Sequence, residues 1–374
     1  MLANSYCFST SLVATHSLLY IMSRHTNSDD ASSRRLSQML RMTSATENGR
    51  HSQIQDSTSS TTTSIPDKQA SENMDLFYPL TRDEALSFVE NKLHIPDPEA
   101  FFRNNKQHFL NHLVERLNQV IPFTNMHFFT STPFCNLTSE DYKQHIFSDL
   151  GGICIWINPF TKALLEQLGY KAYHVCGNNP GDTRNDTHIS TIACDVSYPG
   201  SRHLVDPGTR RPLCAAIPLD FEKESPAYKF HFMKSKFFWR EGDILVWCAQ
   251  SSQRVPESQV MYDSNGEKWQ IQVTYWLKEK TTWHRYRGLW QKFGNVSPQT
   301  FRHPFNGLVF FAYLKDQIVS ILGFKDNIAV IFYKEDSYRK VHMTRTELMN
   351  FFQKHYPQYP ARMLQEVFQS CQLQ

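Results

Sequence analysis

Three residues whose types could form a nucleophilic site follow one another along the chain: Cys154, His188 and Asp206. Cys154 comes directly after Gly151 and Gly152 and begins an apolar run that favours a helix, whereas His188 opens one strand-like run and Asp206 closes another. A thiol at a turn, with a histidine and a carboxylate on consecutive strands, is how a fold assembles a Cys-His-Asp triad. The arrangement points to covalent acyl chemistry that needs no cofactor bound to the protein.

These side chains have complementary roles in such chemistry. A free thiol has a pKa of about 8.5, so a neighbouring histidine must take its proton before it can attack a thioester or an amide. A carboxylate behind the histidine fixes its tautomer and stabilises the imidazolium. We expect the two glycines to let the chain turn sharply and to place Cys154 at the N-terminus of a helix, whose dipole favours a thiolate.

Other residues compete for these roles. His174 and His203 are alternative bases, and Asp195 is the rival carboxylate. A single cysteine is most often a small buried hydrophobe, and we interpret Cys176 and Cys194, on strand-like runs, in that way.

The composition limits the kinds of partner and compartment. The chain has 374 residues, a net charge of +3 and 40% hydrophobic residues, which suits two or three globular domains and gives no reason to expect nucleic acid or an anionic membrane as a partner. Its 8 cysteines are scattered singly, which indicates reduced thiols in a cytoplasmic protein. The 16 histidines show no zinc-type spacing, and no stretch approaches the roughly 18–20 apolar residues of a membrane span.

The chain is predicted to consist of a disordered leader followed by an α+β fold. Residues 1–73 are rich in Ser, Thr, Asn and Gln and cannot bury enough apolar surface to order themselves. Helices are expected after a capping box at 81–84, over 98–118, after residue 154 and after a second capping box at 344–347. Strands rich in Val, Ile, Tyr and Phe are expected at 170–177, 188–197, 203–206, 229–238, 244–248, 269–276, 307–314, 317–322 and 327–333. Helices first, then a mostly antiparallel sheet and a mixed C-terminal part, predict the α+β class.

Four motifs resemble those of the arylamine N-acetyltransferase family. The family's Pro-Phe-Glu-Asn motif matches Pro122–Asn125, and its Arg-Gly-Gly-x-Cys-x-Glu/Gln-x-Asn motif matches Leu150–Asn158. Its triad histidine begins a strand as His188 does, and its Val-Asp-x-Gly element matches Val205–Gly208. The motifs stand in family order with similar gaps, and the resemblance extends over about Leu76–Phe368.

The resemblance implies a fold with a helical first domain, a β-barrel second domain and a C-terminal α/β lid around a cysteine-protease-like catalytic core. We place these domains at 74–153, 154–250 and 251–374, after the leader at 1–73.

The activity implied by the resemblance is ping-pong acetyl transfer. Cys154 would attack acetyl-CoA, CoA would leave, and an aromatic amine or hydrazine would take the acetyl group. His188 would be the base and Asp206 its orienter, since neither His174 nor His203 is followed by an aspartate at the family's spacing. Acetyl-CoA is thus expected as a cosubstrate, with no tightly bound cofactor and no metal.

The same register implies residues that bind the two substrates. Arg184, Asn185 and Gly208 fall where the family contacts CoA, and Phe123 and Thr209 fall at the acceptor pocket. We expect a cytoplasmic monomer that acts on small molecules, without nucleic acid or membrane as partners.

Four positions depart from the family pattern. Leu150 and Thr124 replace an arginine and a glutamate that are expected to pair as ions in the family, and losing both charges can leave the fold unharmed. Trp156 replaces a glutamate or glutamine, and Thr209 an aromatic residue. Two other functions therefore stay open: a papain/transglutaminase-like amide hydrolase or crosslinker, and a non-catalytic descendant that binds a ligand or partner.

Overall fold

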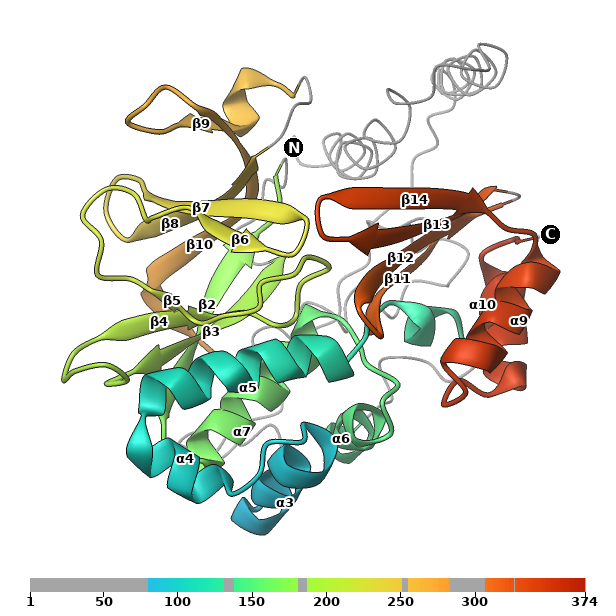
Figure 1. The fold of residues 1–374 in the computed structure, drawn as a ribbon, viewed down its shortest axis with the longest axis horizontal. Helices are drawn as coiled ribbons and strands as arrows, with labels where there is room; N and C mark the ends of the chain where they lie inside the picture. Colours follow the sequence, from blue (N-terminus) through green and yellow to red (C-terminus); the bar gives the residue numbers. More distant parts are fainter. Residues whose placement is uncertain are drawn as a thin grey trace, which may run out of the picture.

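The structure, a computed structural model, describes residues 80–130, 138–180, 187–250, 255–282, 307–325 and 327–373. Two antiparallel sheets stand side by side above a group of helices, and two further helices flank the smaller sheet (Figure 1). The mixed helix-and-sheet class is confirmed, and the larger sheet is curled into a half-barrel. The predicted leader at 1–73 lies outside the described residues.

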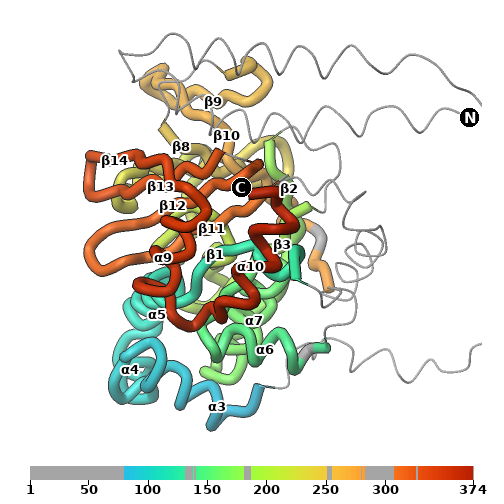
Figure 2. Tube along the Cα trace, turned by 90° about the vertical axis from the view of Figure 1, so that its right-hand side faces the viewer, coloured from blue at the N-terminus to red at the C-terminus, as the bar shows by residue number. Residues whose placement is uncertain are grey.

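The described chain up to residue 167 contains six α- or π-helical segments: α3 (Arg82–Ser87), the π-helical η1 (Phe88–Lys92), α4 (Pro98–Asn104), α5 (Lys106–Val120), α6 (Ser139–Phe147) and α7 (Cys154–Gln167). The short strand β1 (Phe123–Thr124) and the 3-10 turn η2 (Met126–Phe129) lie between α5 and α6. The capping box predicted at 81–84 is present at the start of α3. The helix predicted over 98–118 is two helices, because Asn105 has extended backbone and its side chain accepts a hydrogen bond from the His108 N–H at 2.9 Å. In both views α3, α4 and α6 lie at the end of the molecule away from β9 (Val260–Tyr262) (Figures 1 and 2).

The larger sheet has the strand order β5-β4-β3-β2-β10-β8-β7-β6, with β9 paired to β10. Its strands are β2 (Lys171–Asn178), β3 (His188–Cys194), β4 (Arg202–Val205), β5 (Ile217–Pro218), β6 (Tyr228–Phe230), β7 (Met233–Trp239), β8 (Ile244–Gln250), β9 and β10 (Lys268–Thr281), with the 3-10 turn η4 (Glu257–Gln259) before β9. The single strand predicted over 229–238 is a hairpin, because the chain turns at His231, whose φ of 51° breaks the extended conformation. Phe237, Trp247 and Tyr275 are fully buried in the core that this sheet encloses.

The smaller sheet has the order β1-β11-β12-β13-β14. Its strands are β1 (Phe123–Thr124), β11 (Leu308–Leu314), β12 (Gln317–Phe324), β13 (Asn327–Lys334) and β14 (Ser337–His342). The helices α9 (Arg345–His355) and α10 (Ala361–Ser370) and the 3-10 turn η2 (Met126–Phe129) pack with it, and the predicted capping box at 344–347 opens α9. Phe310 on β11 meets the rings of Phe352 and Tyr359 at 5.0 and 5.9 Å, so this second core is largely aromatic.

Each sheet takes in a strand from a distant part of the sequence. β10 follows residue 250, yet it lies between β2 and β8 in the middle of the larger sheet. β1 comes from the helical part of the chain, yet it is the edge strand of the smaller sheet. α7 packs against β2 and β3, so the helix that begins at Cys154 lies directly under the strand that begins at His188.

Hydrogen bonds of Asn125 link β1 to the smaller sheet. Its backbone N–H donates to the Val309 carbonyl at 3.2 Å, and its Oδ1 accepts from the Val309 N–H at 2.8 Å. Its Nδ2 donates to the Gly307 carbonyl at 2.8 Å, and the residue is fully buried. The asparagine of the Pro-Phe-Thr-Asn motif therefore extends the pairing of β1 and β11 beyond the end of β1.

We expect Asn125→Ala to lower the free energy of unfolding by about 2–4 kcal/mol, because a buried N–H and a buried carbonyl each lose a partner at about 1–3 kcal/mol. The shift of the urea midpoint, at constant m-value, measures it. Asn327→Ala, at an exposed position that opens β13, is the matched control and should change stability by less than about 0.5 kcal/mol. Similar shifts for the two variants would contradict the role of Asn125.

Candidate functional site

Cys154 is the first residue of α7. The residue before it, Ile153, is extended and makes no side-chain hydrogen bond to the helix, so no side chain caps this helix end. The positive end of the helix dipole therefore faces the thiol, as the sequence predicted. Cys154 is 8% exposed, so the thiol is largely covered by the surrounding core.

The turn before Cys154 requires glycine for two reasons. Gly151 has a φ of +67°, and a Cβ built on it would lie 2.0 Å from the Pro122 carbonyl oxygen. The Gly152 N–H donates to that same oxygen at 3.1 Å, and the Thr124 N–H donates to the Gly152 carbonyl at 2.8 Å. The turn is thus held against β1 at backbone distance, which fixes where α7 begins.

His188 and Asp206 meet behind the thiol. His188 is the first residue of β3, Asp206 follows the last residue of β4, and these neighbouring strands place the His188 Nε2 2.7 Å from the Asp206 Oδ2. Burial by itself lowers the pKa of His188, but the charges of Asp206 and Cys154 and hydrogen bonds to both outweigh burial and raise this pKa to about 10. The arrangement favours a protonated imidazole between a carboxylate and the sulfur.

Asp206 accepts two further hydrogen bonds from side chains. The Tyr275 hydroxyl donates to its Oδ2 at 2.8 Å, and the Asn158 Nδ2 donates to its Oδ1 at 2.7 Å. Asn158 also donates to the Ile189 carbonyl at 2.6 Å and accepts from the Gly208 N–H at 3.0 Å. A Cβ on Gly208 would lie 2.8 Å from Asn158, so this glycine lets the loop after β4 close onto α7.

The alternative base and carboxylate residues lie in other surroundings. His174 Nδ1 is 3.3 Å from the Ser190 carbonyl, and burial, aided by the Lys162 charge, lowers the pKa of His174 to about 3. The His203 Nε2 lies 3.1 Å from the Ser197 hydroxyl. Asp195 bonds Lys171 at 2.7 Å at the protein surface. The fold therefore brings Cys154, His188 and Asp206 together and leaves their rivals out.

Thr124 and Leu150, at the two positions where the resemblance implies a charged pair, have neutral partners. Thr124 is 1% exposed and its Oγ1 accepts from the Met126 N–H at 3.3 Å. Leu150 packs at the edge of the aromatic core, and its carbonyl accepts from the Tyr359 hydroxyl at 2.9 Å. Neither substitution leaves a lone buried charge, which agrees with the expectation that losing both charges preserves the fold.

Trp156 is a core residue. Its ring centroid lies 4.6 Å from that of His127 and 5.0 Å from that of Tyr142. A Cβ on Gly152 would come within 2.5 Å of the indole, so the second glycine of the turn makes room for it. Burial, together with the His145 charge, lowers the pKa of His127 to about 3, so the indole packs against a neutral imidazole.

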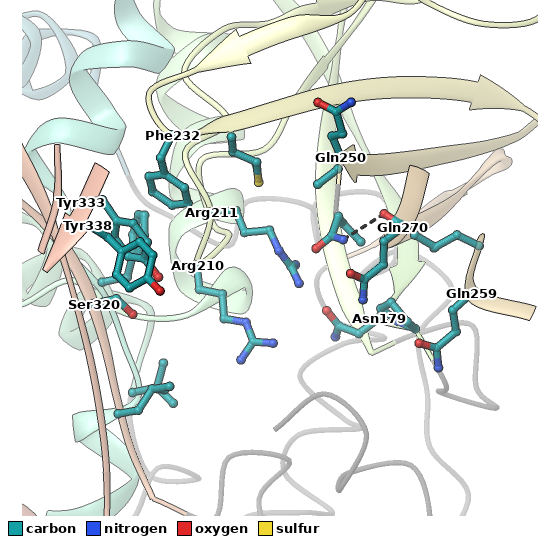
Figure 3. A pocket seen from close by; sticks show the side chains of 18 of the residues that line it. Asn179, Arg210, Arg211, Phe232, Gln250, Gln259, Gln270, Ser320, Tyr333 and Tyr338 are labelled. Atoms are coloured by element: carbon teal, nitrogen blue, oxygen red, sulfur yellow. Dashed lines mark hydrogen bonds between the residues drawn. The ribbon is translucent and has the colours of Figure 1, made fainter. Parts of the chain in front are cut away.

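The residues predicted to bind the two substrates are found in different parts of the chain. Arg184 and Asn185 lie outside the described residues. Phe123 is buried on β1 beside Phe311, and the Thr209 hydroxyl donates to the Arg211 carbonyl at 2.8 Å within its own turn. Neither residue lines the cavity that lies between the two sheets (Figure 3). Phe311, which pairs with Phe123, and Arg210, which follows Thr209 in the chain, do line it.

Tyr275 is a site residue that the sequence does not mark. It lies in an aromatic strand, where every ring suggests core packing, and 69 residues separate it from Asp206. No local signal marks such a residue, because its role depends on β10 lying next to β2. Within the described ranges, no group of three or more His, Cys, Asp or Glu side chains could hold a metal ion, and no helix is long and apolar enough to cross a membrane.

Comparison with known proteins agrees with this geometry. A sequence model of the N-acetyltransferase family matches residues 108–284, which include Cys154, His188 and Asp206. This part of the chain belongs to the arylamine N-acetyltransferase family. The resemblance seen in the four motifs is thereby confirmed, and the protein is an acyltransferase.

Solved arylamine N-acetyltransferases share the fold. A variant of the Mycobacterium smegmatis enzyme with one cysteine replaced by glutamine has 18% sequence identity and a TM-score of 0.57, covering 77% of this chain and 98% of that one. The Mycobacterium marinum enzyme in complex with CoA has 17% identity and a TM-score of 0.58, covering 76% and 99%. The Mycobacterium abscessus enzyme has 16% identity and a TM-score of 0.57, covering 83% and 100%. No curated protein matches the chain.

We expect Gly151→Ala to destabilise the protein by several kcal/mol more than Gly266→Ala. Both residues have a positive φ, +67° and +76°, so both alanines bear a left-handed strain of about 1–2 kcal/mol. Only the Gly151 Cβ also meets a backbone atom, whereas nothing lies within 4 Å of the Gly266 position. Urea unfolding of the two variants measures the difference, and equal losses of stability would contradict the close approach of the turn to β1.

Proposed function

We propose that the protein transfers an acetyl group from acetyl-CoA to an aromatic amine or hydrazine by a ping-pong mechanism, through a thioester at Cys154. The observation that carries the proposal is the buried contact of His188 with Asp206 at 2.7 Å, beside a thiol at the start of α7, in an acyltransferase. The CoA bound to the Mycobacterium marinum relative supports acetyl-CoA as the donor.

The first half-reaction acylates the enzyme. The Cys154 sulfur, as a thiolate beside the His188 imidazolium, attacks the thioester carbonyl of acetyl-CoA and forms a carbon–sulfur bond. The carbonyl electrons move onto oxygen, where the N–H groups at the start of α7 can stabilise them. When the tetrahedral intermediate collapses, the bond to the CoA sulfur breaks and His188 gives its proton to the leaving thiolate.

The second half-reaction runs through the same groups. The amine nitrogen attacks the acetyl carbonyl, neutral His188 takes a proton from the nitrogen, and the bond from carbon to the Cys154 sulfur breaks. The thiolate and the imidazolium are thereby restored. Asp206 holds the imidazole with Nε2 toward the carboxylate, which leaves Nδ1 to exchange the proton.

Other features of the enzyme follow as predictions from the same proposal. Arg184, Asn185 and Gly208 would contact CoA, and Phe123 and Thr209 would flank the acceptor. The division into a leader at 1–73, a helical domain at 74–153, a β-barrel domain at 154–250 and a lid at 251–374, around a cysteine-protease-like core, remains a prediction. So do the monomeric state and the cytoplasmic location.

Mixing the protein with acetyl-CoA, without an acceptor, should add one acetyl group, because the thioester accumulates when no amine removes it. Intact mass spectrometry measures the addition, which should disappear in Cys154→Ala. Cys214→Ala is the matched control and should still be acetylated, because burial raises the pKa of Cys214 to about 11 and its thiol contacts the Tyr313 hydroxyl. A folded wild-type protein that gains no acetyl group, or a Cys154→Ala variant that still does, would contradict the proposal.

The pKa of His188 should fall in Cys154→Ala, because the sulfur contributes both charge and a hydrogen bond to the protonated imidazole. In the wild-type protein, the imidazolium should persist through neutral pH and lose its proton only near pH 10. NMR of ¹⁵N-histidine-labelled protein reads this titration, with His174 as an internal reference that stays neutral above about pH 5 in both proteins. Unchanged His188 titration in the variant would show that the sulfur does not interact with the imidazole.

A further inference from the structure

The turn that joins α6 to α7, just before Cys154, contains two residues in the left-handed region. Asp149 has a φ of 59° and Gly151 a φ of 67°. The left-handed conformation strains a residue that has a Cβ, and a glycine changes its conformation easily because it has none. Such a turn keeps its shape only where neighbouring groups hold its peptide planes.

The peptide planes on both sides of Gly151 are held by hydrogen bonds. The plane after it is held by β1, through the hydrogen bond that the Gly152 N–H donates at 3.1 Å. The plane before it is held by the Tyr359 hydroxyl, which donates to the Leu150 carbonyl at 2.9 Å. Because each peptide is planar, fixing two neighbouring planes also fixes φ and ψ of the residue between them. Tyr359 therefore helps to set the backbone angles of the glycine turn.

The Tyr359 hydroxyl is the closer of the two hydrogen-bonding groups that the described residues place at the Leu150 oxygen. The other is the His127 Nε2 at 3.4 Å, a distance longer than usual for an N–H···O hydrogen bond. Burial, aided by the neighbouring Tyr356 and Asp149, raises the pKa of Tyr359. Its hydroxyl therefore keeps its proton and remains a donor.

Tyr359 donates from a rigid position in the loop between α9 and α10, the two helices that flank the smaller sheet (Figure 1). Its own N–H donates to the Tyr356 carbonyl at 3.1 Å, and Pro357 and Pro360 restrict the backbone on either side. Its ring lies 5.8 Å from that of Phe352 in the aromatic core, and the residue is 2% exposed. The loop can therefore hold the turn in place.

Gln358, the residue before Tyr359, contacts the same turn. Its Nε2 donates to the Asp149 carbonyl at 3.3 Å, so two consecutive residues of the loop donate to two consecutive carbonyls. The Asp149 carboxylate in turn bonds Lys92 of η1 at 2.8 Å. The turn is thus attached to the C-terminal helices as well as to β1 and η1.

We propose that Gln358 and Tyr359 are positioning residues for the acetyl transfer, because they hold the turn before α7 and thereby keep the Cys154 sulfur at the His188 imidazole. The inference rests on the proposed role of Cys154, and it gives the loop between α9 and α10 a part in the chemistry. Cys154 begins α7 only four residues after Leu150, so a displaced turn moves the sulfur. A displacement of about 1 Å at reacting atoms can cost about 100-fold in rate.

The test uses Tyr359→Phe, which keeps the ring and removes the hydroxyl. Acetylation of Cys154 by acetyl-CoA, followed by rapid quenching and intact mass spectrometry, should reach a maximal rate about 10-fold below that of the wild type. The acetyl-CoA concentration at half of the maximal rate should stay the same, because the substitution moves the sulfur and not the donor.

Tyr356→Phe is the matched control. It removes a hydroxyl from the same loop and the same aromatic core, where that hydroxyl donates to the Tyr313 carbonyl at 3.3 Å. This variant should be acetylated at the wild-type rate. Each variant loses one buried hydrogen bond, so urea unfolding should show similar losses of stability for the two.

The NMR titration of His188 gives a readout that a loss of stability alone would not move. The Cys154 sulfur contributes to the raised pKa of His188, so this pKa should fall in Tyr359→Phe, in the same direction as in Cys154→Ala. It should keep its wild-type value in Tyr356→Phe. Asp206 and Tyr275, which also lie beside the imidazole, are the same in both variants.

Gln358→Ala tests the same idea without altering the aromatic core. Gln358 is half-buried, and its loss should slow acetylation by about 2- to 3-fold, the lower end of what one hydrogen bond contributes. Gln353→Ala, at an exposed position of α9, is its control and should leave the rate unchanged. This pair keeps the inference testable if Tyr359→Phe does not fold.

Three results would overturn the inference: a wild-type rate of acetylation in Tyr359→Phe and Gln358→Ala, an unchanged His188 titration in Tyr359→Phe, or equal effects of Tyr359→Phe and Tyr356→Phe. All of them leave acetyl transfer through Cys154 intact. If the wild-type protein is not acetylated, the proposed function fails instead. A fall of the His188 pKa in Tyr359→Phe alone would then still support the positioning of the sulfur.

Discussion

The arrangement of α7, β3 and β10 depends on the hydrogen bonds that they supply to one buried carboxylate, that of Asp206. An ionised carboxylate removed from water costs several kcal/mol unless hydrogen bonds replace its hydration. Asp206 is fully buried and receives three of them, from His188 on β3, Asn158 on α7 and Tyr275 on β10. These donors come from a helix and two strands, so all three elements must be in place before the carboxylate is satisfied. The interaction that orients the histidine is therefore also one that locks the helix to the larger sheet.

A second constraint fixes the position of Cys154. The backbone of the Gly151–Gly152 turn pairs with β1, and β1 in turn is joined to the smaller sheet through Asn125. Leu150 and Thr124, at positions where the resemblance implies charges, lie in this region and are neutral. Because the backbone contacts hold the turn, the site geometry does not require an ion pair between them. Cys154, His188 and Asp206 thus lie where the larger sheet, the smaller sheet and α7 meet.

Much of the local structure could be predicted because its causes are local. The capping boxes at 81–84 and 344–347 begin helices, since each satisfies the first N–H groups of its own helix. The strands that flank His188 and Asp206 follow from runs of β-branched and aromatic residues. Predictions failed where one residue changed the backbone: Asn105 divides a helix, and His231 turns a predicted strand into a hairpin. Neither residue type forces the change by itself, because both conformations depend on the packing of the flanking segments.

The sequence by itself determined which thiol, histidine and carboxylate are the candidate residues of the site, Cys154, His188 and Asp206, and where the glycine turn precedes the helix. These residues are marked by their types and by the short segments around them. Only the tertiary structure decided that Tyr275 and Asn158 complete the hydrogen bonding of Asp206, and that Arg210 and Arg211 share a cavity with rings from β11 and β13. Such partners are separated by 48 to 69 residues at Asp206, and by about a hundred or more at the cavity. Their proximity results from sheet order and helix packing, which depend on the free energy of the whole fold and leave no pattern in any short stretch of sequence.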